Sequence, residues 1–242
     1  MAQPDLSSKV LESHNEIFAN IFNTFVFEGK QILEPDYLQD EPTENVFLDN
    51  DGNYRNNLRD IFKSYRVKGT GAPVRLAYLG IENQSNIDKD MAVRILSYTA
   101  NCYKKQCDEL AIARRTLKEQ LSNATTESHK QYFTQELERY NNIKLVPAIT
   151  LVLNFSKTEW TNNLSLTDKV DDSNPFKPYM QDFKIYVINI MHLPEAQISK
   201  LTSDFKTLVS FLVNGKAPTE YLRYPVDVLM ALYAYTNDIR YL

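Results

Sequence analysis

Hydrophobic and polar positions alternate along this chain with two different periods. Before residue 30, apolar side chains recur every three or four positions, which indicates one amphipathic helix. The S-x-x-E sequence from Ser13 to Glu16 has the form of a capping box, so we expect this helix to begin there and to end at Gly29. Residues 31–57 are polar and broken by prolines, and we expect irregular structure with at most one short strand, at 46–48.

A β-hairpin is predicted immediately after this polar region. The segments 60–67 (DIFKSYRV) and 74–82 (VRLAYLGIE) have strand-forming side chains, and residues 69–71 (GTG) supply a short turn between them. If the hairpin is centred on the second glycine of that turn, Val67 lies opposite Arg75. The same register then fixes which side chains meet at the open end of the hairpin.

The rest of the chain alternates between predicted helices and strands. We expect a long helix from about 88 to 121, helices at 127–140 and 225–235, a helix opened by Pro194, and strands at 146–155 and 183–190. The strand VPAITLVLNF is apolar throughout, as in a strand that is covered on both faces. This order predicts an α/β fold.

Length and composition fit that fold. The chain has 242 residues, of which 43% are hydrophobic, enough for one large domain or for a core domain with a helical appendage. No apolar run approaches the roughly 20 residues of a membrane span, and MAQPDLSSKV lacks the regions of a signal peptide. We therefore expect a cytoplasmic protein with no membrane partner.

The cysteine and histidine residues do not have the spacing of a disulfide, a metal site or a catalytic triad. Cys102 and Cys107 lie five helical steps apart, roughly 140° around the axis, which disfavours a disulfide or a shared metal site. His14, His129 and His192 have no ligand spacing, which argues against a zinc site or a histidine-based triad. Carboxylates remain as metal ligands.

Charge is distributed unevenly. The net charge of −4 does not favour bulk electrostatic binding to nucleic acid. Between residues 53 and 79, however, six positive charges stand against one negative charge, a local balance of +5. These residues are Arg55, Arg59, Asp60, Lys63, Arg66, Lys68 and Arg75.

The one acid in this basic stretch has a predicted partner on the next strand. Side chains on a strand alternate between its faces, so Tyr78, Gly80, Glu82 and Gln84 share one face. The hairpin register places Asp60 directly opposite Glu82, with Cβ atoms about 4.5–5.5 Å apart. A one-residue bulge would change this pairing.

Two carboxylates at that distance repel each other unless a cation lies between them, and a hard divalent ion with oxygen ligands is the natural occupant. Gly80 on the same face would leave room for it. The alternative is that Asp60 begins a strand and that Glu82 is a solvated residue at a strand end.

The predicted helix that follows presents a related set of residues. Met91, Arg94 and Tyr98 lie at positions i, i+3 and i+7 and therefore share one face, just after Gln84. Arg94 could contact a phosphate or brace Glu82. It could equally be a surface arginine whose stem packs on an aromatic ring.

The segment GIENQSNIDKDMAVRILSYTANCYKKQ resembles the signature of the Rpn family, recombination-promoting nucleases and putative transposases of the PD-(D/E)XK nuclease superfamily. HNEIFANIFNTFVFEGKQIL, LRDIFK and KLVPAITLVLNFSKTEW match the family as well, so the resemblance extends to about residue 214. It implies a PD-(D/E)XK-like α/β core, a mixed four-stranded sheet flanked by helices in residues 1–214. Residues 215–242 would form a C-terminal helical extension, packed on or near the core.

The resemblance also implies roles for individual residues. Asp60 corresponds to the first acid of the family pattern, Glu82 to the second, and Gln84 to the position often held by lysine; Asn23 matches a polar position near the site. Glutamine does not titrate, so it can only orient water. Ala92 stands where relatives often have proline.

We therefore expect a metal-dependent DNA endonuclease. Asp60 and Glu82 would bind Mg²⁺ or Mn²⁺, and Gln84 would position water. The DNA backbone or the site would be held by supporting residues: Arg94, Tyr98, Asn23, Lys63, Arg66 and Lys68. A homodimer is a further expected partner, because two sites cut two strands.

Two other hypotheses remain open. The chain could be a catalytically weak nucleic-acid-binding or regulatory module on the same fold, which its acidic net charge favours. Alternatively, the long helix and the helical tail could form an oligomerisation surface, with the two acids incidental.

Overall fold

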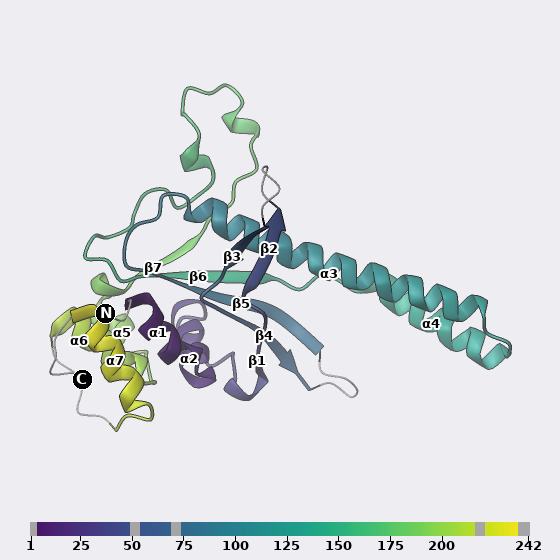
Figure 1. Cartoon of the computed structure of the whole chain (residues 1–242), viewed down its shortest axis with the longest axis horizontal. Helices are drawn as coiled ribbons and strands as arrows, with labels where there is room; N and C mark the ends of the chain where they lie inside the picture. Colours follow the sequence, from purple (N-terminus) through teal and green to yellow (C-terminus); the bar gives the residue numbers. More distant parts are fainter. Residues whose placement is uncertain (1–3, 49–53, 69–73, 216–220, 237–242) are drawn as a thin grey trace.

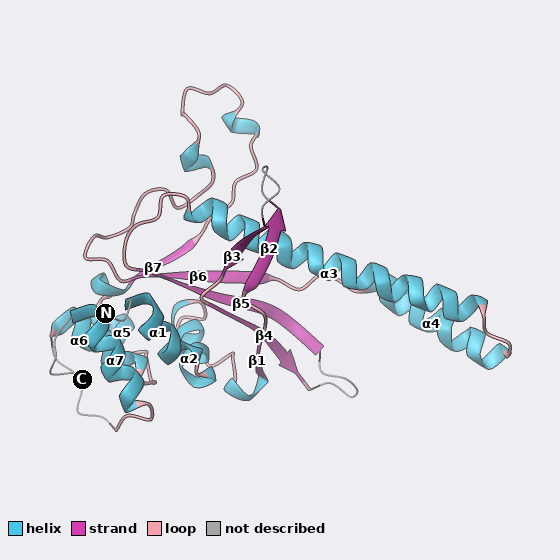
Figure 2. Cartoon of the chain, in the orientation of Figure 1, coloured by secondary structure: helices cyan, strands magenta, loops and turns pink. Residues whose placement is uncertain are grey.

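The computed structural model describes residues 4–48, 54–68, 74–215 and 221–236, and only the backbone of 4–7, 44–48 and 54–58. Its centre is a five-stranded mixed sheet with the order β1-β4-β5-β6-β7 (Figure 2). The strands are β1 (Leu38–Asp40), β4 (Ile61–Val67), β5 (Val74–Gln84), β6 (Ala148–Asn154) and β7 (Tyr186–Asn189). The α/β architecture with a mixed sheet is thus confirmed, with one strand more than expected.

The pairing within the sheet follows from the connections. β1 and β5 both pair antiparallel with β4, whereas β5, β6 and β7 run parallel. A parallel neighbour requires a long crossover, and here two helices fill the segment between β5 and β6. Both faces of β6 are covered, which explains its apolar sequence: residues 150–155 are buried.

Five helices cover one face of the sheet (Figure 1). They are α1 (Pro4–Ser13), α2 (Asn15–Phe25), α5 (Glu195–Ile198), α6 (Phe205–Asn214) and α7 (Pro225–Thr236). Their apolar faces meet Ile61, Ile81 and Leu153 in one large core. Helix α7 packs on α1 and α6 and contributes Val228 and Leu232 to that core.

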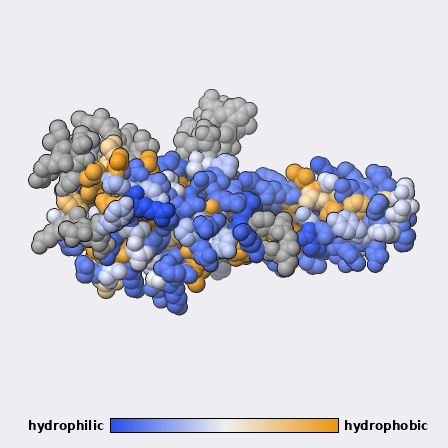
Figure 3. All heavy atoms as spheres, turned by 90° about the horizontal axis from the view of Figure 1, so that it is seen from below, coloured by the Kyte–Doolittle hydropathy of each residue, from blue (hydrophilic) through white to orange (hydrophobic). Residues whose placement is uncertain are grey.

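The opposite face is covered by α3 (Met91–Ser122), the longest helix. Its first turns form a second core with Val152, Trp160 and Ile185. Beyond Gln106, α3 has no buried residue, and with α4 (Glu127–Asn142) it forms a helical arm that projects from the body (Figure 1). The face of the arm that Figure 3 shows is mostly hydrophilic, with a few hydrophobic residues among the polar ones.

Several local predictions were wrong. A separate helix, α1, precedes α2, and Ser13 ends α1 by donating its hydroxyl to the carbonyl of Val10 instead of capping α2. The polar region after α2 contains β1 and a two-stranded sheet of β2 (Glu44–Leu48) and β3 (Tyr54–Leu58). The helix expected after Pro194 is interrupted between α5 and α6, where Asn20 binds Thr202 and Ser203.

Short 3₁₀ helices complete the fold: η1 (Pro35–Tyr37), η2 (Thr167–Lys169), η3 (Lys177–Tyr179) and η4 (Ile190–His192).

None of the described helices combines the length and the apolar character that a membrane span requires.

The packing of α7 generates a stability prediction. Leu232 is 3% exposed within the main core, whereas Leu229 on the same helix is 40% exposed. We expect Leu232→Ala to lower the free energy of unfolding by about 2–5 kcal/mol, because it leaves a cavity. Leu229→Ala should change it by about 0.5 kcal/mol or less. Urea unfolding of both variants measures this, and equal effects would show that α7 does not pack as described.

Candidate active site

The two predicted acids lie side by side at the end of the β4–β5 hairpin. Ile61 pairs with Ile81, and Asp60 immediately precedes β4 while Glu82 continues β5. The expected register therefore holds at this end of the hairpin. It is wrong near the turn, because a register shift between Tyr65 and Arg66 places Val67 opposite Val74. The predicted turn at 69–71 lies outside the described residues.

Glu82 is buried, so the alternative of a solvated strand-end acid is wrong. Its side chain is 1% exposed. Arg94 donates from Nη2 to Oε2 of Glu82 at 3.0 Å, whereas Oε1 has no hydrogen-bond partner. Burial and the charge of Asp60 raise the pKa of Glu82 to about 8. Three weaker effects lower this pKa: the charge of Arg94, a hydrogen bond from the backbone N–H of Asp60, and the charge of Arg59.

Asp60 is held by the neighbouring strand. Its Oδ2 accepts the backbone N–H of Asn83 at 2.8 Å. The Asn83 side chain points to the other face of the sheet, where its Nδ2 donates to Oε2 of Glu12 at 2.5 Å. Glu12 is fully buried on α1. The sequence interpretation missed Glu12 and Asn83, because only a correct prediction of α1 could have placed an acid beneath the end of β5.

Gln84 is the last residue of β5 and is half-buried on the same face as Glu82. Its backbone carbonyl accepts the N–H of Phe155, which extends the pairing of β5 and β6. The structure thus brings Asp60, Glu82 and Gln84 to one end of the hairpin.

Arg94 and Tyr98 line this end of the hairpin from α3. Arg94 donates to Asp88 at 2.8 Å as well as to Glu82, so its guanidinium bridges two carboxylates. Tyr98 is buried next to it, and burial, together with the charge of Glu82, raises the pKa of its hydroxyl. In this structure Arg94 braces Glu82, one of the two roles considered from the sequence.

Three basic residues of the stretch 53–79, Lys63, Arg66 and Arg75, form ion pairs. Lys63 is 1% exposed and binds Asp40, and Arg66 donates to Glu41 at 2.9 Å. Glu41 is itself largely buried and also lies 3.6 Å from Arg75. Lys68 is exposed, and the Arg55 side chain lies outside the described residues. The local charge of +5 is therefore offset in part by Asp40 of β1 and by Glu41, which follows it.

Asn23 binds the loop that follows α2, and Gly80 lies against Thr150 of the neighbouring strand. The Asn23 side chain binds Gln31 and the backbone of Ile32 and Leu33, so it holds the loop after α2. A Cβ atom at Gly80 would come within 3.1 Å of the Thr150 hydroxyl on β6. The expectation that Gly80 leaves room for an ion is therefore wrong, because Thr150 occupies that space.

The acid pair fits a magnesium-like ion. Among the residues that the structure describes, no three His, Cys, Asp or Glu side chains gather as a metal cluster. Mg²⁺, however, usually binds one or two carboxylates and keeps several water ligands. The unpaired buried oxygen of Glu82 beside Asp60 is a donor that such an ion would satisfy.

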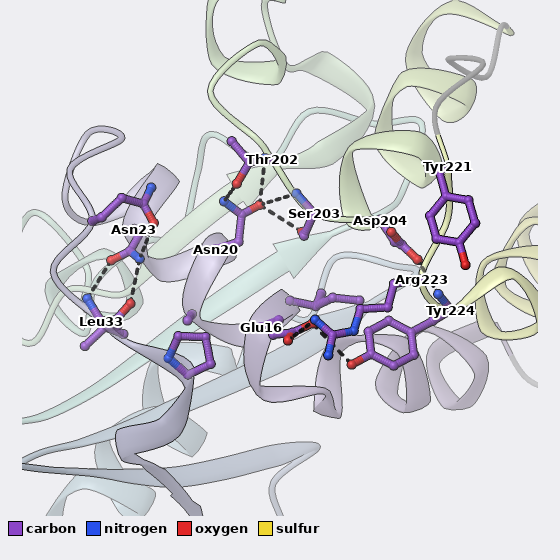
Figure 4. Close-up of a pocket in the computed structure, with 14 residues that line it drawn as sticks. Glu16, Asn20, Asn23, Leu33, Thr202, Ser203, Asp204, Tyr221, Arg223 and Tyr224 are labelled. Carbon is purple, nitrogen blue, oxygen red and sulfur yellow. Dashed lines mark hydrogen bonds and ion pairs between the residues drawn. The ribbon is translucent and has the colours of Figure 1, made fainter.

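A separate polar cavity of about 390 Å³ lies between α2 and the segments that precede α6 and α7 (Figure 4). Its lining includes Glu16, Asn20, Asp204, Tyr221 and Arg223. Neither acid of the pair lines it. Its polar groups largely bind one another, as in the ion pair of Arg223 with Glu16.

The raised pKa of Glu82 predicts a pH-dependent stability. Between an unfolded pKa of about 4.5 and the folded value of about 8, the native state holds a proton that the unfolded chain releases. The free energy of unfolding should therefore fall as pH rises through this window, by up to about 1.4 kcal/mol per pH unit. Glu82→Gln should remove this slope, because glutamine does not titrate.

Urea unfolding between pH 5 and pH 8.5, with a chelator present, measures the slope. Glu138→Gln is the matched control, because Glu138 is exposed on the arm. Parallel profiles for the wild type and for Glu82→Gln would contradict the burial of this carboxyl group.

Comparison with known proteins identifies the family. The family model described as "Putative transposase, YhgA-like" matches residues 28–238, which include the acid pair, α3 and α7. No curated protein and no solved structure matches the chain. The match confirms the family expected from the sequence motifs. The chain belongs to the family of YhgA-like putative transposases.

Proposed function

We propose that this protein is a metal-dependent DNA endonuclease that serves recombination or mobile elements. The observation that carries the proposal is the acid pair: buried Glu82 keeps one carboxylate oxygen without a hydrogen bond, next to half-buried Asp60 and at the end of a hairpin. Burying one carboxylate next to another is costly unless a cation joins them. Membership of the transposase family supports chemistry on DNA.

Asp60 and Glu82 would hold Mg²⁺ or Mn²⁺. A bound ion of this kind lowers the pKa of water and offsets charge on phosphoryl oxygens. Gln84 would orient the attacking water by hydrogen bonds, because its amide lies on the same face as Glu82 and cannot take a proton. The backbone N–H of Asn83 holds Asp60 in place.

Arg94 would exchange partners during the reaction. Its side chain is about one-third exposed and already bridges Glu82 and Asp88. A phosphate group of DNA could replace either carboxylate in a charge-assisted contact. Exposed Lys68 is a second candidate for backbone contacts, whereas Lys63 and Arg66 serve mainly to bind the β1 segment.

A second candidate function is a catalytically weak regulatory or nucleic-acid-binding module on the same fold. The Arg94 contact favours it, because this arginine occupies Oε2 of Glu82 and closes part of the site. In that case no divalent ion would bind the pair. DNA binding, if it occurred, would weaken steeply as salt is raised.

Plasmid cleavage tests the nuclease. Purified wild-type protein should nick supercoiled plasmid with Mg²⁺ or Mn²⁺, and a chelator should stop the reaction. Asp60→Asn and Glu82→Gln should each reduce the rate by about 100-fold or more. Asp172→Asn is the control, because Asp172 is an exposed acid that pairs with Lys177. Cutting that survives both site substitutions would indicate a contaminating enzyme.

Metal binding should be coupled to proton release. Because the pKa of Glu82 is about 8, this group is mostly protonated at pH 7, and a bound ion must displace its proton. Affinity for Mn²⁺ should therefore rise with pH up to about 8. Calorimetry in buffers of different ionisation enthalpy counts the released protons. Binding that is independent of pH, or unchanged in Glu82→Gln, would place the ion elsewhere.

A further inference from the structure

Arg59 is a buried arginine with an unusual set of neighbours. It is 2% exposed and immediately precedes Asp60. Its guanidinium lies over the Phe62 ring at 4.0 Å from the centroid and over the Tyr98 ring at 4.9 Å. The side chain is therefore held between a ring of β4 and a ring of α3.

Within the part of the chain that the structure describes, no ion pair compensates the charge of Arg59. None of the ion pairs among the described residues includes Arg59, and its Nε has no hydrogen-bond partner. Leaving water is costly for a cation, and contact with desolvated aromatic rings offsets only part of that cost. The Glu82 carboxylate interacts electrostatically with this guanidinium, as do Cys102 and Tyr98.

One of these two rings, Phe62, belongs to a stack across the hairpin. Phe62 stacks on Tyr78 at 5.4 Å with an interplanar angle of 12°, and Arg75 lies over Tyr78 at 4.5 Å. The stack thus has an arginine near each end. Arg75 differs from Arg59 in having carboxylate partners, Glu41 and Glu109.

Asp60 needs such an anchor. It lies in a bend just before β4, outside the paired register that begins at Ile61. Its Oδ2 accepts the backbone N–H of Asn83, its own backbone N–H donates to Glu82, and Arg59 is the residue that precedes it in the chain. A guanidinium fixed between two rings restricts the backbone at the adjacent residue.

We propose that Arg59 is a positioning residue of the acid pair, one that the rings of Phe62 and Tyr98 hold so that it fixes Asp60 and offsets the repulsion between Asp60 and Glu82. Arg94 also supplies positive charge, but it occupies an oxygen of Glu82. Arg59 acts through space and leaves Oε1 of Glu82 without a hydrogen bond. The inference rests on the proposed function, because the acid pair is the metal site.

Arg59→Lys tests the proposal, and Arg75→Lys is its matched control. Both variants keep the charge and lose a planar guanidinium from the same stack, but Arg75 lies at the far end of β5 from Glu82. We expect Arg59→Lys to weaken Mn²⁺ binding, measured by calorimetry, by about 10- to 100-fold. Arg75→Lys should leave this affinity within about twofold.

A second measurement does not require metal or activity. In ¹⁵N-labelled protein, the backbone amide signal of Asn83 reports its hydrogen bond to Asp60. It should shift in Arg59→Lys and stay in place in Arg75→Lys. If Arg59→Lys does not fold, Phe62→Leu removes one ring beneath Arg59 and should give the same shift.

The outcomes separate the two proposals. An Asn83 signal that is unchanged in Arg59→Lys, or equally shifted in Arg75→Lys, would overturn the role of Arg59. A wild-type protein that neither binds Mn²⁺ nor cuts DNA would overturn the proposed function, even if the Asn83 signal moves only in Arg59→Lys. Equal losses of affinity in both lysine variants would show that the stack matters only for stability.

Discussion

The burial of the Glu82 carboxyl group beside Asp60 is the constraint on which the site depends. A buried acid next to a second acid is tolerated only as a protonated group, as a partner of cations, or as a metal ligand. Arg94 satisfies one oxygen of Glu82, and the other has no hydrogen bond. The surrounding elements keep this arrangement in place: β4 sets the register, and α3 carries the arginine.

How much of this could be predicted from the sequence depends on the distance over which each contact acts. The hairpin end was predictable because alternation and a short connection determine its pairing, and the bulge between Tyr65 and Arg66 falls on the turn side of the acids. The contact of Glu12 with Asn83 was not, because it joins residues 71 positions apart. No local pattern marks such a pair before α1 itself is placed.

The basic stretch at 53–79 shows that exposed positive charge is equally hard to predict from local sequence. A local balance of +5 suggests a surface for phosphate only if the side chains reach solvent. Here Lys63 and Arg66 bind acids of a segment that was expected to be irregular but forms β1. Counting charges along a sequence therefore overestimates the exposed positive charge wherever an unpredicted strand supplies the opposite sign.

The three arginines around the hairpin differ in what holds them, and this decides what each can do. Carboxylates hold Arg75, and a carboxylate of the site itself holds Arg94, so under the proposed function an anionic substrate would compete for Arg94. Aromatic rings hold Arg59, so its charge can act on the acid pair without a carboxylate having to leave the guanidinium. A site that must bring two acids together and still leave an oxygen for a ligand needs positive charge of this last kind. Ion pairing would occupy the very oxygens that the ligand requires.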